Sequence, residues 1–261
     1  MRTSSAHVEV GLRGHVAMLT LNNPERRNVM DMETAAAMQE AVERLGRDPQ
    51  VRCVVIAGSG GVFASGADIR ELDAAGAEEN LAYNRRLRAS VNAVAALPVP
   101  TVAALNGHTL GGGLELALAC LLRIASTEAK LGLPEVRLGI IPATGGLARL
   151  PITIPRTVAA ELALTGELIS GAEAKELGLV NAAVPPEEVL DRALELAAKI
   201  ARVAPLSARA IVESLRRDRN LPIADANLQV EDRLAALLAS RDRREGARAF
   251  LERREPEFEG L

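Results

Sequence analysis

The segment Pro100-Thr-Val-Ala-Ala-Leu105-Asn-Gly-His-Thr-Leu110-Gly-Gly-Gly-Leu-Glu115 decides the fold, because an apolar run leads through glycines into a second apolar run. Thr101 to Leu105 predicts a buried strand, and Leu114 to Leu122 is apolar at helical length. Gly111 to Gly113 should therefore form a strand-to-helix turn. Backbone N–H groups at such a turn are free to hold a developing oxyanion.

A second glycine-rich turn is predicted where the buried run Val54 to Ala57 enters the segment Gly58 to Ile69. Two such turns supply one N–H each to a carbonyl that gains negative charge, as when a thioester becomes an enolate. Glu115 lies directly behind the first turn, and Glu135 follows twenty residues later in Leu133-Pro-Glu135. Together they indicate acid/base chemistry on an activated acyl group, although Glu115 alone could serve only the helix dipole.

The order of elements predicts an α/β fold with a helical C-terminal part. Strand-like and helical runs alternate in the first half, as in His15 to Leu21 followed by a helix over Asp31 to Arg47. From about Pro185 only helical patterns remain. We therefore divide the chain into a core, residues 1–184, and a helical region, residues 185–261. Ser170-Gly-Ala-Glu173 predicts a capped helix that precedes a strand at Gly178-Leu-Val180.

Composition limits the classes of function. Of the 261 residues, 48% are hydrophobic and 25% charged, which is typical of a soluble globular protein. Aromatic residues make up 2%, with no Trp. Binding of single-stranded nucleic acid through stacking of its bases on aromatic side chains is therefore disfavoured. The formal charge is −3, which excludes a globally basic protein.

Targeting and metal-binding signals are absent from the sequence. The first seven residues match neither a signal nor a transit peptide, and no apolar run reaches the roughly 20 residues that cross a bilayer, so we expect a cytoplasmic protein. His7, His15 and His108 lack metal-ligand spacing. Cys53 and Cys120 are expected to be buried small hydrophobes. No phosphate-binding or dinucleotide-binding glycine motif is present.

Several motifs occur in the order found in the enoyl-CoA hydratase/isomerase, or crotonase, superfamily, and the chain resembles this family over nearly its whole length. The motifs are Asn23-Pro24-Glu-Arg-Arg27-Asn28, Phe63-Ala-Ser-Gly-Ala-Asp68, Asn106-Gly107, Leu110-Gly-Gly-Gly-Leu-Glu-Leu-Ala-Leu-Ala-Cys120, Leu133-Pro-Glu135, Leu138-Gly-Ile-Ile-Pro142, Gly145-Gly146, Arg149-Leu150, Leu164-Thr165-Gly166 and Ala174-Lys-Glu-Leu-Gly-Leu-Val180. The resemblance implies a spiral of ββα units followed by a C-terminal helical trimerisation region.

The resemblance also implies the site and its reaction. The oxyanion-hole amides would belong to Ala67 and Gly112, and the catalytic carboxylates would be Glu115 and Glu135. Because it has both glutamates, the chain resembles the enoyl-CoA hydratases within this family. These enzymes catalyse the reversible syn hydration of a 2-trans-enoyl-CoA to a 3-hydroxyacyl-CoA in fatty-acid β-oxidation or branched-chain catabolism. We assign Glu115 as the base that activates water and Glu135 as the acid at the α carbon, although the sequence does not fix this order.

Coenzyme A is then part of the substrate, and the resemblance implies no metal and no separate cofactor. Candidate residues for binding the acyl-CoA are Arg26, Ala67, Asp68, Ile69, Arg70, Gly112, Phe250 and Arg253. Arg27 is an alternative to Arg26. Phe250 and Arg253 resemble residues of a C-terminal helix that reaches the acyl-CoA site, in some relatives from a neighbouring subunit. A homotrimer or homohexamer is expected, with no membrane association.

Three departures from the family pattern leave the substrate open. They are Ser65, Leu121, and Ala143-Thr144 after Pro142. An enoyl-CoA isomerase needs only a carboxylate at position 135, and Leu97-Pro-Val-Pro-Thr101 resembles methylglutaconyl-CoA hydratases. Some relatives of that branch bind RNA. Arg85, Arg86 and Arg88 form a short basic cluster here, but such a cluster is typical of a solvated helix face.

Overall fold

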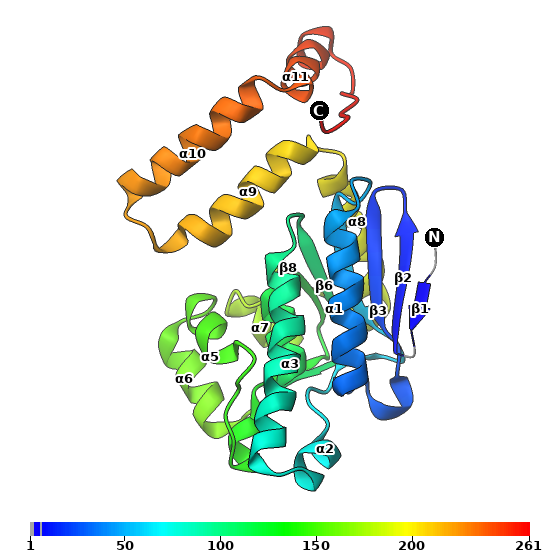
Figure 1. Cartoon of the computed structure of the whole chain (residues 1–261), viewed down its shortest axis with the longest axis vertical. Helices are drawn as coiled ribbons and strands as arrows, with labels where there is room; N and C mark the ends of the chain where they lie inside the picture. Colours follow the sequence, from blue (N-terminus) through cyan, green and yellow to red (C-terminus); the bar gives the residue numbers. More distant parts are fainter. Residues whose placement is uncertain (1–2, 6) are drawn as a thin grey trace.

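The computed structural model describes residues 3–5 and 7–261, and a sheet of seven strands is the centre of the molecule (Figure 1). The strand order is β1-β2-β3-β4-β6-β8-β11. β1 (Thr3–Ser5), β2 (Val8–Arg13) and β3 (Val16–Leu21) pair antiparallel. The other pairings are parallel and join β3, β4 (Cys53–Gly58), β6 (Thr101–Leu105), β8 (Leu122–Ser126) and β11 (Ala182–Val184).

A smaller sheet carries the turns on which the predicted site depends. Its order is β10-β9-β7-β5, with bounds Ile169–Ser170, Lys130–Gly132, His108–Leu110 and Val62–Ala64. Each of β4, β6 and β8 is followed in sequence by one of β5, β7 and β9 and then by helical turns. These are the predicted ββα units. The short strands β5 and β7 lie side by side, so the turns after them meet at one place.

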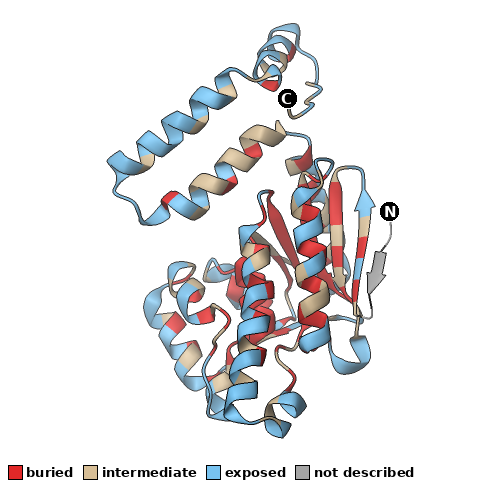
Figure 2. Cartoon of the chain, viewed as in Figure 1, coloured by how far each residue is buried: buried red, intermediate tan, exposed pale blue. Residues whose placement is uncertain are grey.

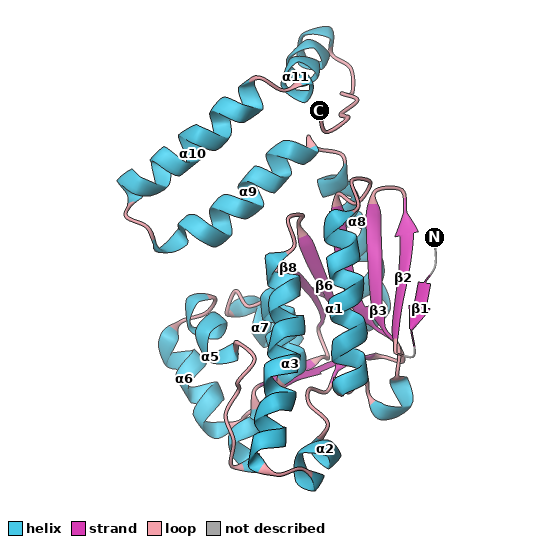
Figure 3. Ribbon diagram, viewed as in Figure 1, coloured by secondary structure: helices cyan, strands magenta, loops and turns pink. Residues whose placement is uncertain are grey.

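Helices cover both faces of the large sheet (Figure 3). α1 (Met32–Arg47) and α3 (Ala77–Ala96) pack on one face with Val54 and Ile56 of β4. α8 (Val189–Ala201) packs on the other face with Cys53 and Val55. The period of two along a strand sends these neighbours to opposite faces, which explains why β4 is apolar at every position. Cys53 and Cys120 are both buried and free, as expected.

The remaining helices surround the small sheet or follow α8. They are α2 (Ile69–Ala74), α4 (Gly112–Ala119), α5 (Gly146–Arg149), α6 (Arg156–Thr165), α7 (Gly171–Glu176), α9 (Pro205–Arg217), α10 (Ile223–Leu238) and α11 (Arg241–Glu252), with short 3-10 turns η1 (Pro24–Arg26), η2 (Pro134–Leu138), η3 (Leu150–Ile152), η4 (Pro186–Glu188) and η5 (Asp218–Asn220). We call α9–α11 the C-terminal arm. It extends from the core, and α10 buries none of its residues (Figure 2).

Helix signals in the sequence were mostly accurate. Asp31 caps α1 by accepting a hydrogen bond from the Thr34 amide, and the helix ends at Arg47 as predicted. Ser170 and Glu173 form the predicted capping box of α7. The division at residues 184 and 185 stays a prediction. No helix of the described residues is both long and apolar enough to cross a membrane.

Two predicted elements were wrong in extent or place. The helix expected over Leu114 to Leu122 ends at Ala119, because the chain turns at Cys120 and enters β8 at Leu122. Apolar composition alone could not separate the buried helix from the buried strand that follows it. The strand expected at Gly178-Leu-Val180 is a turn, in which Gly178 adopts φ +77°, and β11 begins only at Ala182.

Candidate active site

One cavity brings together the four residues assigned to the reaction. Ala67 lies between β5 and α2, Gly112 and Glu115 lie in the first turn of α4, and Glu135 lies in η2. The cavity has a volume of about 120 Å³. Its lining residues are Ser65, Gly66, Ala67, Ile69, Leu72, Tyr83, Asn84, Leu87, Gly111, Gly112, Glu115, Pro134, Glu135, Leu138, Ile140, Ile141, Ala143 and Thr144.

The two glycine-rich turns touch through their backbones. A Cβ atom added at Gly66 would lie 2.9 Å from the Leu110 carbonyl oxygen and 3.0 Å from the Gly112 nitrogen. A Cβ atom added at Gly112 would lie 3.7 Å from the Ala67 nitrogen. Within the described chain, neither the Ala67 nor the Gly112 amide donates a hydrogen bond. Two unused N–H groups therefore lie close together at the cavity wall, as an oxyanion hole requires.

Glu115 is fixed by three donors from the loop before α5 and from the first residue of that helix. Its side chain is buried, and Oε1 accepts hydrogen bonds from the Thr144 amide at 2.8 Å and the Gly146 amide at 2.7 Å. The Thr144 hydroxyl donates to Oε2. A Cβ atom at Gly146 would lie 3.0 Å from Oε1, so glycine leaves room for this approach. The donors replace water around the carboxylate and set its orientation.

Glu135 has a different environment from Glu115. Burial, together with the negative charge of Glu115, raises the pKa of Glu135 to about 7. Its Oε2 atom is buried and has no hydrogen-bond partner among the described residues. A Cβ atom added at Gly111 would lie 3.0 Å from its Oε1, so this carboxyl group lies directly against the turn before α4. Two carboxyl groups with different environments can serve as base and acid.

Several predicted coenzyme A ligands already have partners within the chain. Asp68 accepts a hydrogen bond from the Arg70 amide at 3.0 Å and so caps α2. Arg26 forms ion pairs with Asp68 and with Asp31, the latter at 3.1 Å. The two carboxylates neutralise the charge that a phosphate would otherwise meet. These contacts give Arg26 and Asp68 a structural part in holding the turn at Ala67.

Tyr83 was not singled out by the sequence analysis, although it is the only tyrosine in the chain. Its hydroxyl accepts a hydrogen bond from the Asp68 amide at 3.0 Å and donates one to the Met30 carbonyl at 2.6 Å. Burial raises the pKa of this phenol above its ordinary value. Tyr83 thus ties α3 to the backbone next to Ala67.

The other predicted binding residues lie in two places. Ile69 is 56% exposed and lines the cavity, and Arg70 follows it on the surface. Phe250 lies in the last turn of α11, and Arg253 is the C-cap residue that follows this helix. α11 lies at the opposite end of the molecule from α2 (Figure 1). Phe250 is 82% exposed. A single copy of the chain therefore does not bring these two residues to the cavity.

The residues that depart from the family pattern also lie in two places. Ser65, Ala143 and Thr144 line the cavity, and Thr144 contacts Glu115 directly. Leu121 lies away from it and lines a second pocket. Among the described residues, no group of three or more His, Cys, Asp or Glu side chains is arranged to hold a metal ion.

Comparison with known proteins places these features in one family. The family model for enoyl-CoA hydratase/isomerase matches residues 12–261. An (E)-benzylidenesuccinyl-CoA hydratase of Thauera aromatica is 39% identical over 254 residues, 97% of this chain and 99% of the relative. A 2,3-dehydroadipyl-CoA hydratase of Escherichia coli is 36% identical over 253 residues, 96% of this chain and 98% of the relative.

A solved structure confirms the predicted crotonase fold. The enoyl-CoA hydratase of Bacillus anthracis superposes with a TM-score of 0.96 at 34% identity, over 98% of this chain and 100% of the other. The sequence match, the superposition and the paired glycine-rich turns agree. The chain belongs to the enoyl-CoA hydratase/isomerase family.

Proposed function

We propose that the protein catalyses the reversible syn hydration of a 2-trans-enoyl-CoA to a 3-hydroxyacyl-CoA. The observation that carries this proposal is the presence of two carboxyl groups, Glu115 and Glu135, in one cavity with two free backbone amides. Addition of water to the conjugated double bond needs a base, an acid and stabilisation of the thioester enolate. The cavity contains a candidate for each.

The amides of Ala67 and Gly112 are the candidates for the oxyanion hole. As water adds to the β carbon, the electron pair of the double bond moves toward the thioester oxygen and forms an enolate. Backbone N–H groups stabilise this charge without having to reorganise, and removal of one such donor from an enzyme costs about 2.7 to 4 kcal/mol. The close approach of the turns at Gly66 and Gly112 supports this assignment, because it brings the two amide nitrogens near each other.

The environments of the glutamates support Glu115 as base and Glu135 as acid. Glu115 takes a proton from water, and its oriented oxygens direct the resulting hydroxide toward the β carbon. Glu135, with a pKa near 7, is partly protonated at neutral pH and donates its proton to the α carbon. The product then contains the hydroxyl group of the water and the proton that Glu135 carried. Glu115 is left protonated and Glu135 ionised, and proton exchange with solvent restores both groups to their starting states.

The lining of the cavity favours a short, uncharged acyl group. Apolar side chains such as Leu72, Leu87 and Ile140 contribute to the wall, and no Lys, Arg or His is found among the described lining residues. The volume of about 120 Å³ is below the roughly 300 to 1,000 Å³ of sites for drug-sized ligands. A second carboxylate on the acyl chain, as the names of the Thauera and Escherichia relatives imply for their substrates, would lack a counter-charge here.

An enoyl-CoA isomerase is the second candidate. The observation that favours it is the unpartnered Oε2 of Glu135, because one carboxyl group that moves a proton between the α and γ carbons suffices for isomerisation. In that case Glu115 would have only a structural role. The identity of the product separates the two reactions.

The test is turnover of crotonyl-CoA by the purified protein, followed by loss of the conjugated thioester absorbance and by identification of the product. We expect 3-hydroxybutyryl-CoA, with at least a 100-fold loss of kcat in both Glu115→Gln and Glu135→Gln. Glu128→Gln, at an exposed glutamate outside the cavity, is the matched control. Wild-type turnover by a folded Glu115→Gln variant would reject the two-carboxylate mechanism.

A further inference from the structure

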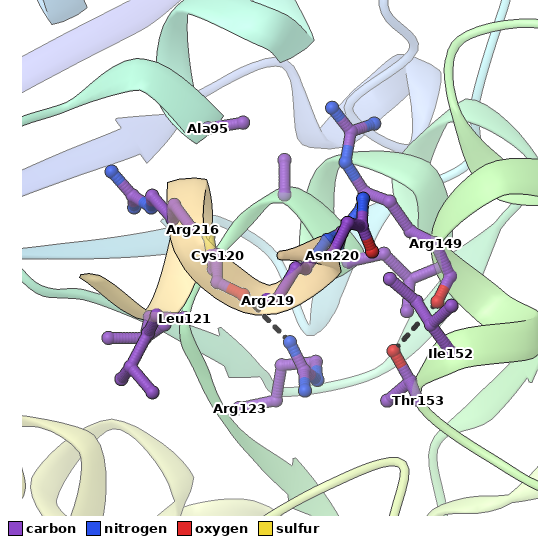
Figure 4. A pocket seen from close by; sticks show the side chains of 13 residues that line it. Ala95, Cys120, Leu121, Arg123, Arg149, Ile152, Thr153, Arg216, Arg219 and Asn220 are labelled. Carbon is purple, nitrogen blue, oxygen red and sulfur yellow. Dashed lines mark hydrogen bonds between the residues drawn. The ribbon is translucent and has the colours of Figure 1, made fainter. Parts of the chain in front are cut away.

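A second pocket lies between the core and the C-terminal arm, and arginines dominate its lining (Figure 4). Its volume is about 560 Å³. Arg123 enters from β8, Arg149 from the end of α5, Arg216 from α9, and Arg219 from η5. Three separate parts of the sequence therefore bring four positive charges to one place.

No carboxylate neutralises these charges in the described part of the chain. The lining contains no Asp or Glu, and none of the four arginines forms an ion pair there. The acceptors that hold their guanidinium groups are neutral. Arg123 donates to the Cys120 carbonyl at 2.7 Å, and Arg149 donates to the Asn92 side chain at 2.7 Å and to the Thr144 carbonyl at 3.2 Å. These bonds orient the groups but leave their charge uncompensated.

Two of the arginines keep unused donors. Nη1 of Arg216 donates to the Leu97 carbonyl, whereas its Nη2 is buried and has no partner among the described residues. The side chain of Arg219 has neither a hydrogen bond nor an ion pair within the described chain. A buried donor without a partner is costly in free energy, and a guanidinium group offers a planar fork that matches an oxyanion.

Burial disfavours the charge of three of these arginines, and Arg149 and Arg219 also repel each other. Burial lowers the pKa of Arg149, and the nearby charge of Arg219 lowers it further, while Glu115 opposes the change. Burial likewise lowers the pKa of Arg123 and of Arg216. Glu115 is not among the residues that line this pocket, and its oxygens already accept three hydrogen bonds. A bound anion would relieve both the repulsion and the missing hydrogen bonds.

We propose that this four-arginine pocket is a binding site for a multivalent oxyanion of the phosphate class, distinct from the cavity of Glu115 and Glu135. Phosphate oxygens accept several guanidinium N–H bonds at once, and the multiple negative charge of the anion can neutralise more than one arginine. The remaining wall includes Leu118, Ile152 and Leu215, with no aromatic residue among those described, so the pocket offers no stacking surface for a base. The proposal is independent of the reaction assigned to the first cavity.

Calorimetric titration with inorganic phosphate tests the proposal, with potassium chloride at matched ionic strength as the reference. We expect saturable binding of one phosphate per chain to the wild type. Arg219→Gln should raise the dissociation constant about tenfold or more, because it removes the arginine that has no other partner. Arg86→Gln, at an exposed arginine of α3, is the matched control and should bind as the wild type does. Circular dichroism verifies that each variant is folded.

Equal affinity in the wild type, Arg219→Gln and Arg86→Gln would overturn the proposal, because binding would then be a general effect of surface charge. Sedimentation velocity in the same buffers addresses the other source of an oxyanion, a carboxylate side chain of a second copy. If the wild type shows no saturable phosphate binding and Arg219→Gln changes the state of association, the pocket receives such a carboxylate and the proposal is wrong.

Discussion

The carboxyl group of Glu135 is buried and one of its oxygens has no partner among the described residues. We therefore expect its protonation state to determine how the rate of the proposed reaction depends on pH. As the acid in hydration it must carry a proton, and with a pKa of about 7 that proton is lost as the pH rises. We therefore predict that kcat/KM for hydration falls tenfold per pH unit above about 7, whereas dehydration gains from the ionised group. Rates in both directions between pH 5.5 and 9 measure this, and a hydration rate that keeps rising to pH 9 would contradict the assignment.

The same shift predicts a change in stability. The folded protein holds the Glu135 proton more tightly than the unfolded chain, whose glutamates titrate near 4.5. The shift therefore supports folding below about pH 4.5, and its contribution is progressively lost as the pH rises through about 7. The neutral variant Glu135→Gln avoids this loss, so above pH 7.5 it should be more stable than the wild type by up to about 3 kcal/mol. Urea unfolding at pH 5 and pH 8 measures the difference, which should shrink at pH 5.

Thr144 departs from the usual family residue, and its hydroxyl donates to Oε2 of Glu115. Thr144→Val keeps the shape but removes this donor from a buried carboxylate. We predict a loss of about 1.5 to 3 kcal/mol in unfolding free energy and at least a tenfold drop in kcat. Thr165→Val is the control, because that hydroxyl donates to the Glu161 carbonyl on the surface. Equal effects of the two substitutions on kcat would show that the Thr144 hydroxyl does not position Glu115.

At the scale of elements, the turn before α4 depends on Gly111. Its backbone has φ +53° and ψ −125°, a conformation that residues with a Cβ atom rarely adopt, and the added atom would lie 3.0 Å from Glu135. Gly111→Ala should cost about 1 to 3 kcal/mol in stability and displace Glu135, so turnover should fall as well. Gly14→Ala is the control, because Gly14 also has a positive φ, +57°, but an added Cβ atom there would meet no other atom within 4 Å. This variant therefore measures the cost of backbone strain alone. Turnover should remain normal in Gly14→Ala.

The glycine-rich turns are among the features that could be predicted from the sequence. The turns at Ala67 and Gly112 and the caps at Asp31 and Ser170 follow from local chemistry, so they were predictable. The three-residue strands β5, β7 and β9 are too short to produce a pattern of their own. The ion pair of Arg26 with Asp68 and the two bonds of Tyr83 join residues far apart in sequence, and no local pattern indicates such contacts.

At the scale of the whole molecule, the C-terminal arm leaves much apolar surface uncovered. α10 buries none of its residues, and Leu228, Leu234 and Leu238 are about half exposed or more. A helix with an uncovered apolar face normally packs against a partner. The predicted trimer or hexamer would provide one. It would also allow Phe250 and Arg253 to reach the cavity of a neighbouring copy.

Association through α10 can be tested with one charge. Leu234→Glu places a carboxylate on the apolar face, and burial of an unpaired charge is costly, so we predict dissociation to smaller species at micromolar concentration. Leu81→Glu is the control, because Leu81 is 51% exposed on α3 and Leu234 is 49% exposed on α10. Sedimentation velocity measures both. In a chain that functions alone, the two substitutions would have equally small effects, and the wild type would itself sediment as a monomer. A loss of association confined to Leu234→Glu, with a higher KM for crotonyl-CoA, would instead mean that neighbouring copies complete each other's sites.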